Sequence, residues 1–269
     1  MDPGTIIGIG LAVGSLLLSM ILEGGNPAGF IVPPAWVLIL GSTLGVTMAS
    51  TGLKSVLKIP GLWIKALTGT VPDRSEAIRT LVRMAERARR EGLLALEEEA
   101  ANVTDPFLAK GVRLVVDGTD PELVKDILDL EVEAMAGRHF ENATIFTHAS
   151  GFAPTMGVLG TCMGLVHVLE NLSDPGSLGP LIAGAFIATL LGVGSANVFY
   201  LPAANKLKEL STHEADARTM MVEGILSIQA GDNPRIVEEK LKTFLTPAER
   251  KAFEAAGENG GQAGLAQAA

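Results

Sequence analysis

The sequence predicts an all-α polytopic membrane protein with four transmembrane helices in two hairpins and a helical cytoplasmic domain. Three observations favour this fold class: four long apolar stretches without charge, a positive mean hydropathy of +0.35, and the confinement of every Lys and Arg to two segments. Glycine is also abundant, with 31 of 269 residues. Small residues are typical of membrane helices, because they let neighbouring helices pack closely in lipid.

Four stretches lack Asp, Glu, Lys and Arg and reach the length of about 20 residues that a helix needs to cross a bilayer. Short segments rich in Gly, Asn and Pro separate the first from the second and the third from the fourth, as expected of tight turns. The first stretch has no basic leader and no small-residue cleavage site after it, so we expect a retained helix. The predicted spans are Gly4–Leu22, Phe30–Ser50, Ala149–Leu169 and Leu178–Leu201.

The basic residues predict the orientation of these spans. All 21 Lys and Arg residues lie in 51–147 and 206–269, and none lies in 1–50 or 148–205. Cytoplasmic flanks of membrane helices attract Lys and Arg. We therefore expect a multi-pass protein of the bacterial inner membrane, with both termini and the 51–147 segment in the cytoplasm and both turns outside.

Five parts follow from this layout: helices 1 and 2 in 1–50, a cytoplasmic helical domain in 51–147, helices 3 and 4 in 148–202, C-terminal cytoplasmic helices in 203–256, and a tail in 257–269. The tail consists mostly of Gly, Ala and Gln, and we expect it to be disordered. In the cytoplasmic domain, Asp73 or Ser75 is suited to cap a helix with an apolar stripe at helical spacing. We expect further helices over Pro121–Arg138, Lys206–Ala230 and Pro234–Phe244.

Several function classes are disfavoured by composition. The net charge of −9 disfavours nucleic-acid binding, which usually needs a surface rich in Lys and Arg. The single cysteine, Cys162, allows no intramolecular disulfide and no cysteine-based metal cluster. We expect neither enzymatic activity nor a cofactor nor a metal site.

Two charge runs meet at the end of the helix that starts near Asp73. Arg89 and Arg90 precede Gly92, and Glu97, Glu98 and Glu99 follow it. One interpretation is a solvated face joined by i,i+4 ion pairs. The other is a docking surface whose mixed charges steer a partner. The residues alone do not choose between them.

The predicted spans hold no acidic or basic residue well inside the bilayer. Glu23, His167 and Glu170 lie near the outer ends of the spans, and the remaining polar residues of the third and fourth spans are neutral. Such hydroxyls and amides usually bond to their own helix or to a neighbouring one, yet as a set they are also suited to line a wet path. An intramembrane ionisable residue is the usual mark of ion transport. If this protein conducts ions, another chain must therefore supply the titrating group. These neutral polar residues are Thr155, Thr161, Thr189, Ser195 and Asn197.

Two prolines lie at the cytoplasmic border of the third and fourth spans. Pro154 is a few residues inside the third span, and Pro202 follows the fourth. A proline removes one backbone hydrogen bond and bends or ends a helix. Pro202 fits a simple helix terminator, whereas Pro154 favours a bend.

The motifs taken together resemble the flagellar stator A subunits, the MotA/PomA branch of the MotA/TolQ/ExbB proton channel superfamily. The resemblance extends from the first span to about Phe253. Four motifs in the same order carry it: ARREGLLALE over 88–97, APTMGVLGT over 153–161, ATLLG over 188–192 and VEGILSIQAG over 222–231.

This resemblance implies a homo-oligomer, expected to be a pentamer, around B-type stator subunits (MotB/PomB-like) that carry a membrane aspartate and bind peptidoglycan. It implies that H+ or Na+ passes through the membrane and turns the rotor through its switch protein, FliG. By motif position, it implies that Thr161 and Thr189 flank the ion path and that Pro154 and Pro202 couple ion flow to movement. The rotor-facing charges are then Arg89, Arg90, Glu97 and Glu98.

Two alternatives remain open. A TolQ/ExbB-type energiser of outer-membrane transport uses the same ion flow, but such relatives typically have three spans, so the four-span layout favours the motor. A membrane scaffold without conduction is a different class, in which the neutral hydroxyls and the bent helix serve packing alone. Conductance in the presence of a B-type partner separates the scaffold from the other two.

Overall fold

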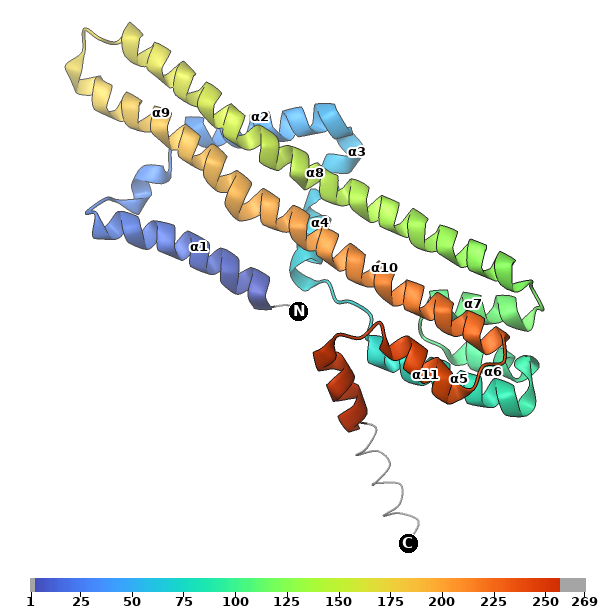
Figure 1. Cartoon of the computed structure of the whole chain (residues 1–269). Helices are drawn as coiled ribbons and strands as arrows, with labels where there is room; N and C mark the ends of the chain where they lie inside the picture. The colour runs from blue at the N-terminus through green and yellow to red at the C-terminus, as the bar shows by residue number, and fades with distance from the viewer. Residues whose placement is uncertain (1–2, 257–269) are drawn as a thin grey trace. The chain divides into compact units, whose positions relative to one another are not determined.

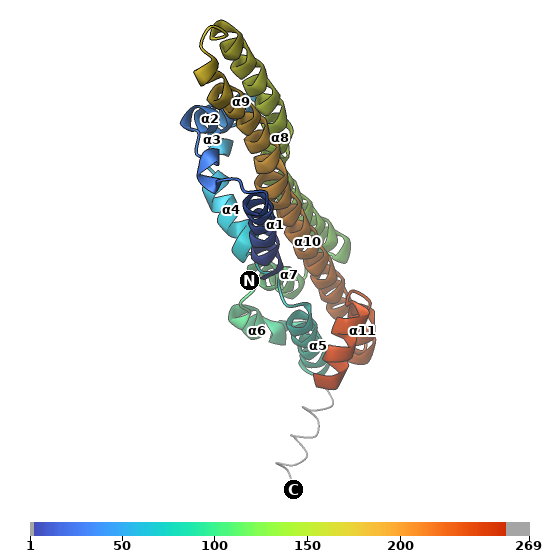
Figure 2. The ribbon, with the colours of Figure 1, turned by 90° about the vertical axis from the view of Figure 1, so that its left-hand side faces the viewer.

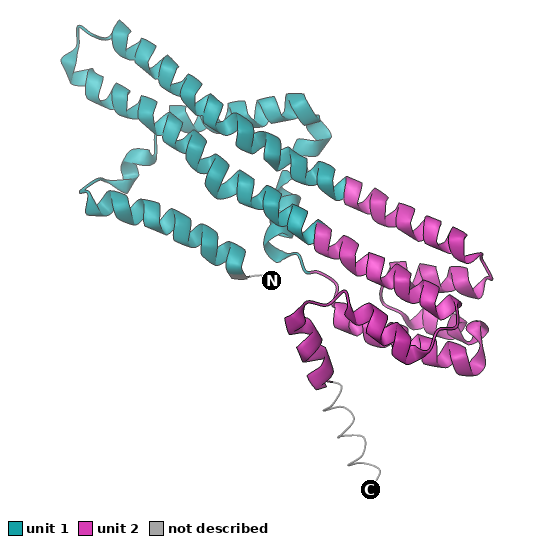
Figure 3. Ribbon diagram, viewed as in Figure 1, with its two compact units in different colours: residues 1–70, 138–211 teal, residues 71–137, 212–269 magenta. Residues whose placement is uncertain are grey.

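The computed structural model describes residues 3–256, and every regular element within them is helical (Figure 1). The chain divides into two compact units, one of residues 1–70 and 138–211 and the other of residues 71–137 and 212–269 (Figure 3). Four helical segments are long and apolar enough to cross a membrane: Gly4–Leu22, Pro33–Thr51, and parts of Pro121–Glu170 and Pro175–Gln229. The predicted fold class is confirmed. The predicted disorder of 257–269 concerns residues outside the described range, and the five-part division stays a prediction.

The first unit contains the four candidate spans. In its N-terminal hairpin, the Asn26 side chain accepts a hydrogen bond from the Ala28 amide and caps η1, while Gly52, at a φ of 85°, ends α2. That φ favours glycine, because a Cβ is crowded there. The elements are α1 (Pro3–Leu22), η1 (Pro27–Phe30), α2 (Pro33–Thr51), α3 (Leu53–Val56), α4 (Ile59–Thr68), the later part of α8 (Pro121–Glu170), α9 (Pro175–Ser195), η3 (Ala196–Tyr200) and the start of α10 (Leu201–Gln229).

Small side chains dominate the core of the first unit. α8 and α9 lie side by side here in two perpendicular views (Figures 1 and 2), and alanines fill much of the space around them. Trp63 of α4 closes this core with an edge-on contact to Phe146, the ring centroids being 6.3 Å apart. α2 packs against α9 and buries one i,i+4 row of side chains, namely Ala35, Ile39, Thr43 and Thr47.

The second unit has a core of large aliphatic and methionine side chains, among them Ile78, Leu81, Met84, Leu128 and Met220, each fully buried. Of the two predicted caps for its first helix, Asp73 is the one used, since its side chain accepts from the amides of Ser75 and Glu76. The elements are α5 (Arg74–Glu91), η2 (Leu93–Ala95), α6 (Leu96–Asn102), α7 (Pro106–Val116), the first part of α8, most of α10, and α11 (Pro234–Lys242), followed by a helical stretch over 247–256.

α8 is longer than the sequence predicted. We expected one helix to end near Arg138 and another to begin near Ala149, but a single helix of 50 residues runs from Pro121 to Glu170. Residues 139–148 contain neither Gly nor Pro, so nothing in them interrupts a helix that has already started.

Candidate functional site

α8 and α9 approach each other along a row of small residues. A Cβ added to Gly192 would lie 2.5 Å from the Ala153 carbonyl oxygen, and one added to Gly157 would lie 3.1 Å from the Thr189 Cα. A Cβ added to Gly164 would likewise lie 2.6 Å from the Cβ of Ala185. In lipid, where apolar burial drives helix association weakly, such close backbone contact is what holds two helices together.

The same close approach brings two threonine hydroxyls together. The Oγ1 atoms of Thr161 on α8 and Thr189 on α9 are hydrogen-bonded to each other across the seam. Thr161 Oγ1 lies 3.1 Å from the Ala185 carbonyl oxygen, and Thr189 Oγ1 lies 3.2 Å from the Gly157 carbonyl oxygen. Both side chains are half-buried. The structure thus joins the two residues that the sequence assigned to one ion path, although they are 28 positions apart.

The other neutral polar residues of these helices bond locally. Thr155 donates to the Phe152 carbonyl at 2.7 Å, Ser195 to the Gly192 carbonyl at 3.1 Å, and Asn197 to the Val193 carbonyl at 2.9 Å. These are the local bonds that polar side chains make in helices. Of the five, only Thr161 and Thr189 have side-chain hydrogen bonds from one helix to the other within the described residues.

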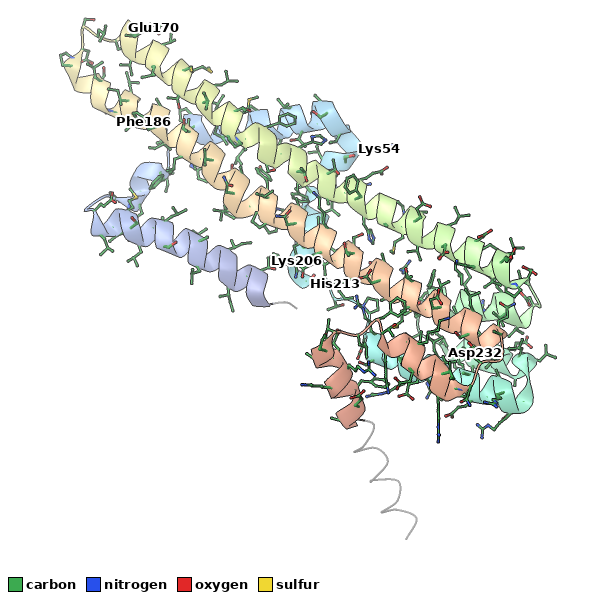
Figure 4. The ribbon with its side chains drawn as sticks, viewed as in Figure 1. Lys54, Glu170, Phe186, Lys206, His213 and Asp232 are labelled. Atoms are coloured by element: carbon green, nitrogen blue, oxygen red, sulfur yellow. The ribbon has the colours of Figure 1, made fainter. Side chains whose placement is uncertain are left out.

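Ionisable groups of the spans lie at or next to the turns that join α1 to α2 and α8 to α9. Glu170 ends α8 at the turn into α9 (Figure 4), and its Oε2 lies 3.3 Å from Nδ1 of His167; both side chains are exposed. Glu23 lies in the turn after α1. Between these turns and the opposite ends, the four described spans hold no carboxylate.

The two prolines expected to couple ion flow to movement, Pro154 and Pro202, differ in their backbone surroundings. Pro154 lies inside α8 without interrupting it. Pro202 follows η3, a π-helical turn over Ala196–Tyr200, in which the amide of Leu201 donates to the carbonyl of Ala196, five residues back. A proline ring clashes with the carbonyl four residues before it, and a π turn relieves that crowding by widening the helix. The helix is therefore irregular in the turn directly before Pro202, which the sequence did not predict.

The predicted docking charges divide into two kinds. Arg89, Arg90 and Glu97 are exposed, and among the described residues they form no ion pair. Glu98 instead binds Arg87, at 2.9 Å between Oε2 and Nη2. The structure brings the basic end of α5 and the acidic start of α6 to one turn around Gly92, whose φ is 86°.

Arg87 is the centre of this turn, and the sequence did not single it out. Its guanidinium binds Glu91 at 3.2 Å, Glu98 at 2.9 Å and Glu99 at 3.1 Å. The hydrogen bond to Glu98, followed by those to Glu99 and Glu91, raises the pKa of Arg87 further above its ordinary value. The spacing of four between Arg87 and Glu91 was a signal for the first pair, but the pairs to α6 depend on the fold of the turn.

Two further threonines were also missed. Thr43 and Thr47 on α2 are fully buried, and their hydroxyl oxygens have no hydrogen-bond partner within the described chain. They lie on the face that packs against α9. Their spacing of four places them on one helix face, but no sequence pattern indicates that neither hydroxyl bonds to its own backbone.

Comparison with known proteins shows the family to which this chain belongs. A family model for the MotA/TolQ/ExbB proton channel family matches residues 99–220. Motility protein A of Borreliella burgdorferi is 41% identical over 254 residues, covering 93% of this chain and 96% of the relative. The motility protein A of Bacillus subtilis is 38% identical over 262 residues, covering 96% of each. The chain belongs to the MotA/TolQ/ExbB proton channel family.

Solved structures of this family agree with the fold. The MotAB stator complex from Bacillus subtilis matches with a TM-score of 0.86 and 38% identity over 92% of this chain and 98% of that chain. C. jejuni MotAB matches with a TM-score of 0.87 and 32% identity, covering 92% and 97%. Within the MotA/TolQ/ExbB family, this chain is therefore a flagellar stator subunit of the membrane, as the sequence predicted. The TolQ/ExbB energisers are its broader family only.

Proposed function

We propose that this stator subunit surrounds a B-type, peptidoglycan-anchored partner, conducts protons with it across the inner membrane, and passes the resulting movement to the rotor. The observation that carries this proposal is the hydroxyl pair of Thr161 and Thr189, in spans that hold no carboxylate. A path lined by hydroxyls can hydrogen-bond water, but it needs a titrating group to move protons selectively. That group comes from the partner chain.

The partner and the stoichiometry rest on the family. The solved relatives are MotAB complexes, which supports a MotB-like partner for this chain. We propose that the chain forms a homo-pentamer around it, with both termini in the cytoplasm, because all Lys and Arg lie on that side of the predicted spans. The family's description as proton channels favours H+ over Na+.

Pro154 and Pro202 are the proposed coupling points. Each lacks the amide proton that would otherwise close one helical turn, so bending the helix costs less there than elsewhere in α8 and α10. The π turn before Pro202 supports this role, since it is a second irregularity in the same stretch. The rotor contact is proposed for Arg89, Arg90 and Glu97 at the other unit's exposed turn, with FliG as the partner.

The test of the whole proposal uses a deletion strain complemented with the chain and its B-type partner. We expect the deletion to paralyse cells that still assemble filaments, and an uncoupler of the proton gradient to stop the complemented cells while removal of sodium does not. Sodium dependence would replace H+ by Na+ as the ion. Normal swimming of a deletion strain without any second stator set would contradict the torque function.

Thr189→Val tests the ion path directly. It keeps the volume and removes the hydroxyl, so we expect reduced proton conductance at an unchanged membrane level. Ser50→Ala is the matched control, because its hydroxyl bonds to the Val46 carbonyl of its own helix at 2.9 Å. Equal conductance of Thr189→Val and wild type would reduce the pair to a packing contact. A current from the chain expressed without its partner would contradict the argument from missing carboxylates.

A further inference from the structure

The exposed turn between α5 and α6 presents an apolar side chain in the middle of its charges. Leu94 of η2 is 74% exposed, whereas Leu93 beside it packs against the core of the unit. A single exposed leucine is ordinary on a protein surface. Leu94, however, lines a surface hollow together with Ala95, Ala101 and three charged side chains, those of Arg87, Glu97 and Glu98.

The charged residues of this turn fall into two groups: those that form ion pairs within the turn and those that form none. Arg87 binds three carboxylates, those of Glu91, Glu98 and Glu99, so its positive charge is fully used within this cluster, which keeps a formal charge of −2. Arg89, Arg90 and Glu97 have no such partner among the described residues. An apolar centre with a charged border is the usual anatomy of a protein interface, in which a few central contacts dominate the binding free energy.

We propose that Leu94 is the apolar anchor of the rotor-docking surface and that Glu98 acts through Arg87, as a positioning residue for the turn. This inference rests on the proposed rotor contact and refines it. The partner is a rotor protein with an apolar socket for Leu94, acidic groups for Arg89 and Arg90, and a basic group for Glu97. Charge complementarity sets this chemistry, since the unpaired charges on this side are two basic residues and one acidic residue.

The position of Leu94 depends on the ion pairs of Arg87. Gly92 turns the chain at a φ of 86°, and the next residues form only one short helical turn, η2. Arg87 lies before that turn, while Glu98 and Glu99 lie after it, so their bonds close a loop that contains Leu94. A loop closed by several charge-assisted bonds holds its apex more firmly than a single pair does.

The experiment uses the complete stator, assembled with its B-type partner in cells whose rotors are intact. It records the number of fluorescent stators at each motor, swimming speed, and proton conductance. For Leu94→Ala we expect a fall in motor occupancy of about tenfold, which is typical of a central interface contact, with conductance unchanged. Leu123→Ala is the matched control, because Leu123 is a 52% exposed leucine of the same unit. Equal occupancy of Leu94→Ala and the control would overturn the anchor.

A double-mutant cycle tests the role of Glu98. If Glu98 acts through Arg87, the combination of Arg87→Ala with Glu98→Ala reduces occupancy no further than Arg87→Ala alone. If Glu98 contacts the rotor itself, the fall in occupancy caused by Glu98→Ala adds to the fall caused by Arg87→Ala. That outcome would contradict the positioning role. Glu98→Gln keeps the side-chain volume, so it replaces Glu98→Ala in the cycle if the alanine variants reach only low membrane levels. Conductance separates the two proposals: a wild-type chain that neither conducts nor reaches motors contradicts the proposed function, not the anchor.

Discussion

The two units solve the same packing problem with different residues. In the first unit, which contains the spans, alanines and glycines let α8 and α9 meet backbone to backbone. In the second unit, large aliphatic side chains and methionines fill a wide core between amphipathic helices. Water drives the second arrangement, because apolar area removed from it is worth about 25 cal/mol per Å². Lipid offers no such gain between helices, so close contact and hydrogen bonds must replace it.

Glycines show the difference most directly. Gly192 in the first unit faces the backbone of the neighbouring helix, which cannot move aside by a change of rotamer. Gly111 and Gly224 in the second unit face the tips of Ile225 and Leu81, which are methyl groups at the ends of flexible side chains. The same glycine-to-alanine change should therefore have different consequences in the two units.

The largest effect is expected for Gly192→Ala. Its Cβ would lie 2.5 Å from the Ala153 carbonyl oxygen and 3.0 Å from the Gly157 Cα, so α8 and α9 must separate. Overpacking usually costs about 1–3 kcal/mol, and a rigid backbone partner should place this variant at or beyond the upper end. We expect a large fall in the thermal stability of the purified stator complex and loss of motility.

Two controls accompany this variant. Gly194→Ala changes the same helix where nothing lies within 4 Å of the added Cβ, and it should behave as wild type. Gly111→Ala should cost about 1 kcal/mol at most, because Ile225 can change its rotamer. Similar losses for Gly192→Ala and Gly111→Ala would contradict the distinction between the two cores.

Most of the fold was predictable from the sequence. Charge-free stretches and the distribution of Lys and Arg are long-range composition signals, and they predicted four spans in two hairpins. Helix ends were harder to predict, because they depend on local breakers: the missing Gly or Pro in 139–148 extends α8 beyond its predicted bounds. Asp73 and Ser75 were both suitable caps, and only the backbone geometry distinguishes them.

The candidate sites were predictable only in part. Motif position identified Thr161 and Thr189, and the structure adds that their hydroxyls bond to each other. The three ion pairs of Arg87 were not predictable as a set, because two of the three carboxylates come from the next helix across a turn. The π turn before Pro202 has no composition signal, since it is a response of the backbone to the proline and its neighbours.

A second prediction concerns the polar groups of the first unit. Thr43 and Thr47 are buried without partners, and a buried unsatisfied hydroxyl costs about 1–3 kcal/mol. Thr43→Val and Thr47→Val keep the shape and remove that cost, so each should raise the thermal midpoint of the stator complex. Thr161→Val should lower it, because it takes away a bonded hydroxyl. A fall in the midpoint for Thr43→Val would indicate a partner for its hydroxyl, such as a bound water.

The smallest predicted effect belongs to the second unit, where helix ends are held by side-chain caps in water. The Thr246 amide donates to the Glu249 carboxylate at 2.8 Å, and the Glu249 amide donates to the Thr246 hydroxyl at 3.3 Å, which together form a capping box for helix 247–256. Hydrogen bonding of the Glu249 carboxylate to the Thr246 amide first, and to the Thr246 side chain second, lowers the pKa of Glu249.

A lowered folded-state pKa means that the ionised carboxylate stabilises the helix above the pKa of the unfolded chain. This stabilisation is lost as the pH falls through the folded-state pKa. We expect the protection factors of the amides in 247–256, which correct the exchange rates for the intrinsic effect of pH, to fall on acidification below about pH 4 in the wild type. Glu249→Gln keeps the box without the charge, so it should remove most of this pH dependence, whereas Glu249→Ala should weaken the helix by about 0.5 kcal/mol at every pH. An unchanged pH profile in Glu249→Gln would assign the acid sensitivity to another carboxylate of the unit. Amides of α9 beyond its first turn, which the Asp174 carboxylate caps, should show no comparable response, because that part of the helix contains no carboxylate.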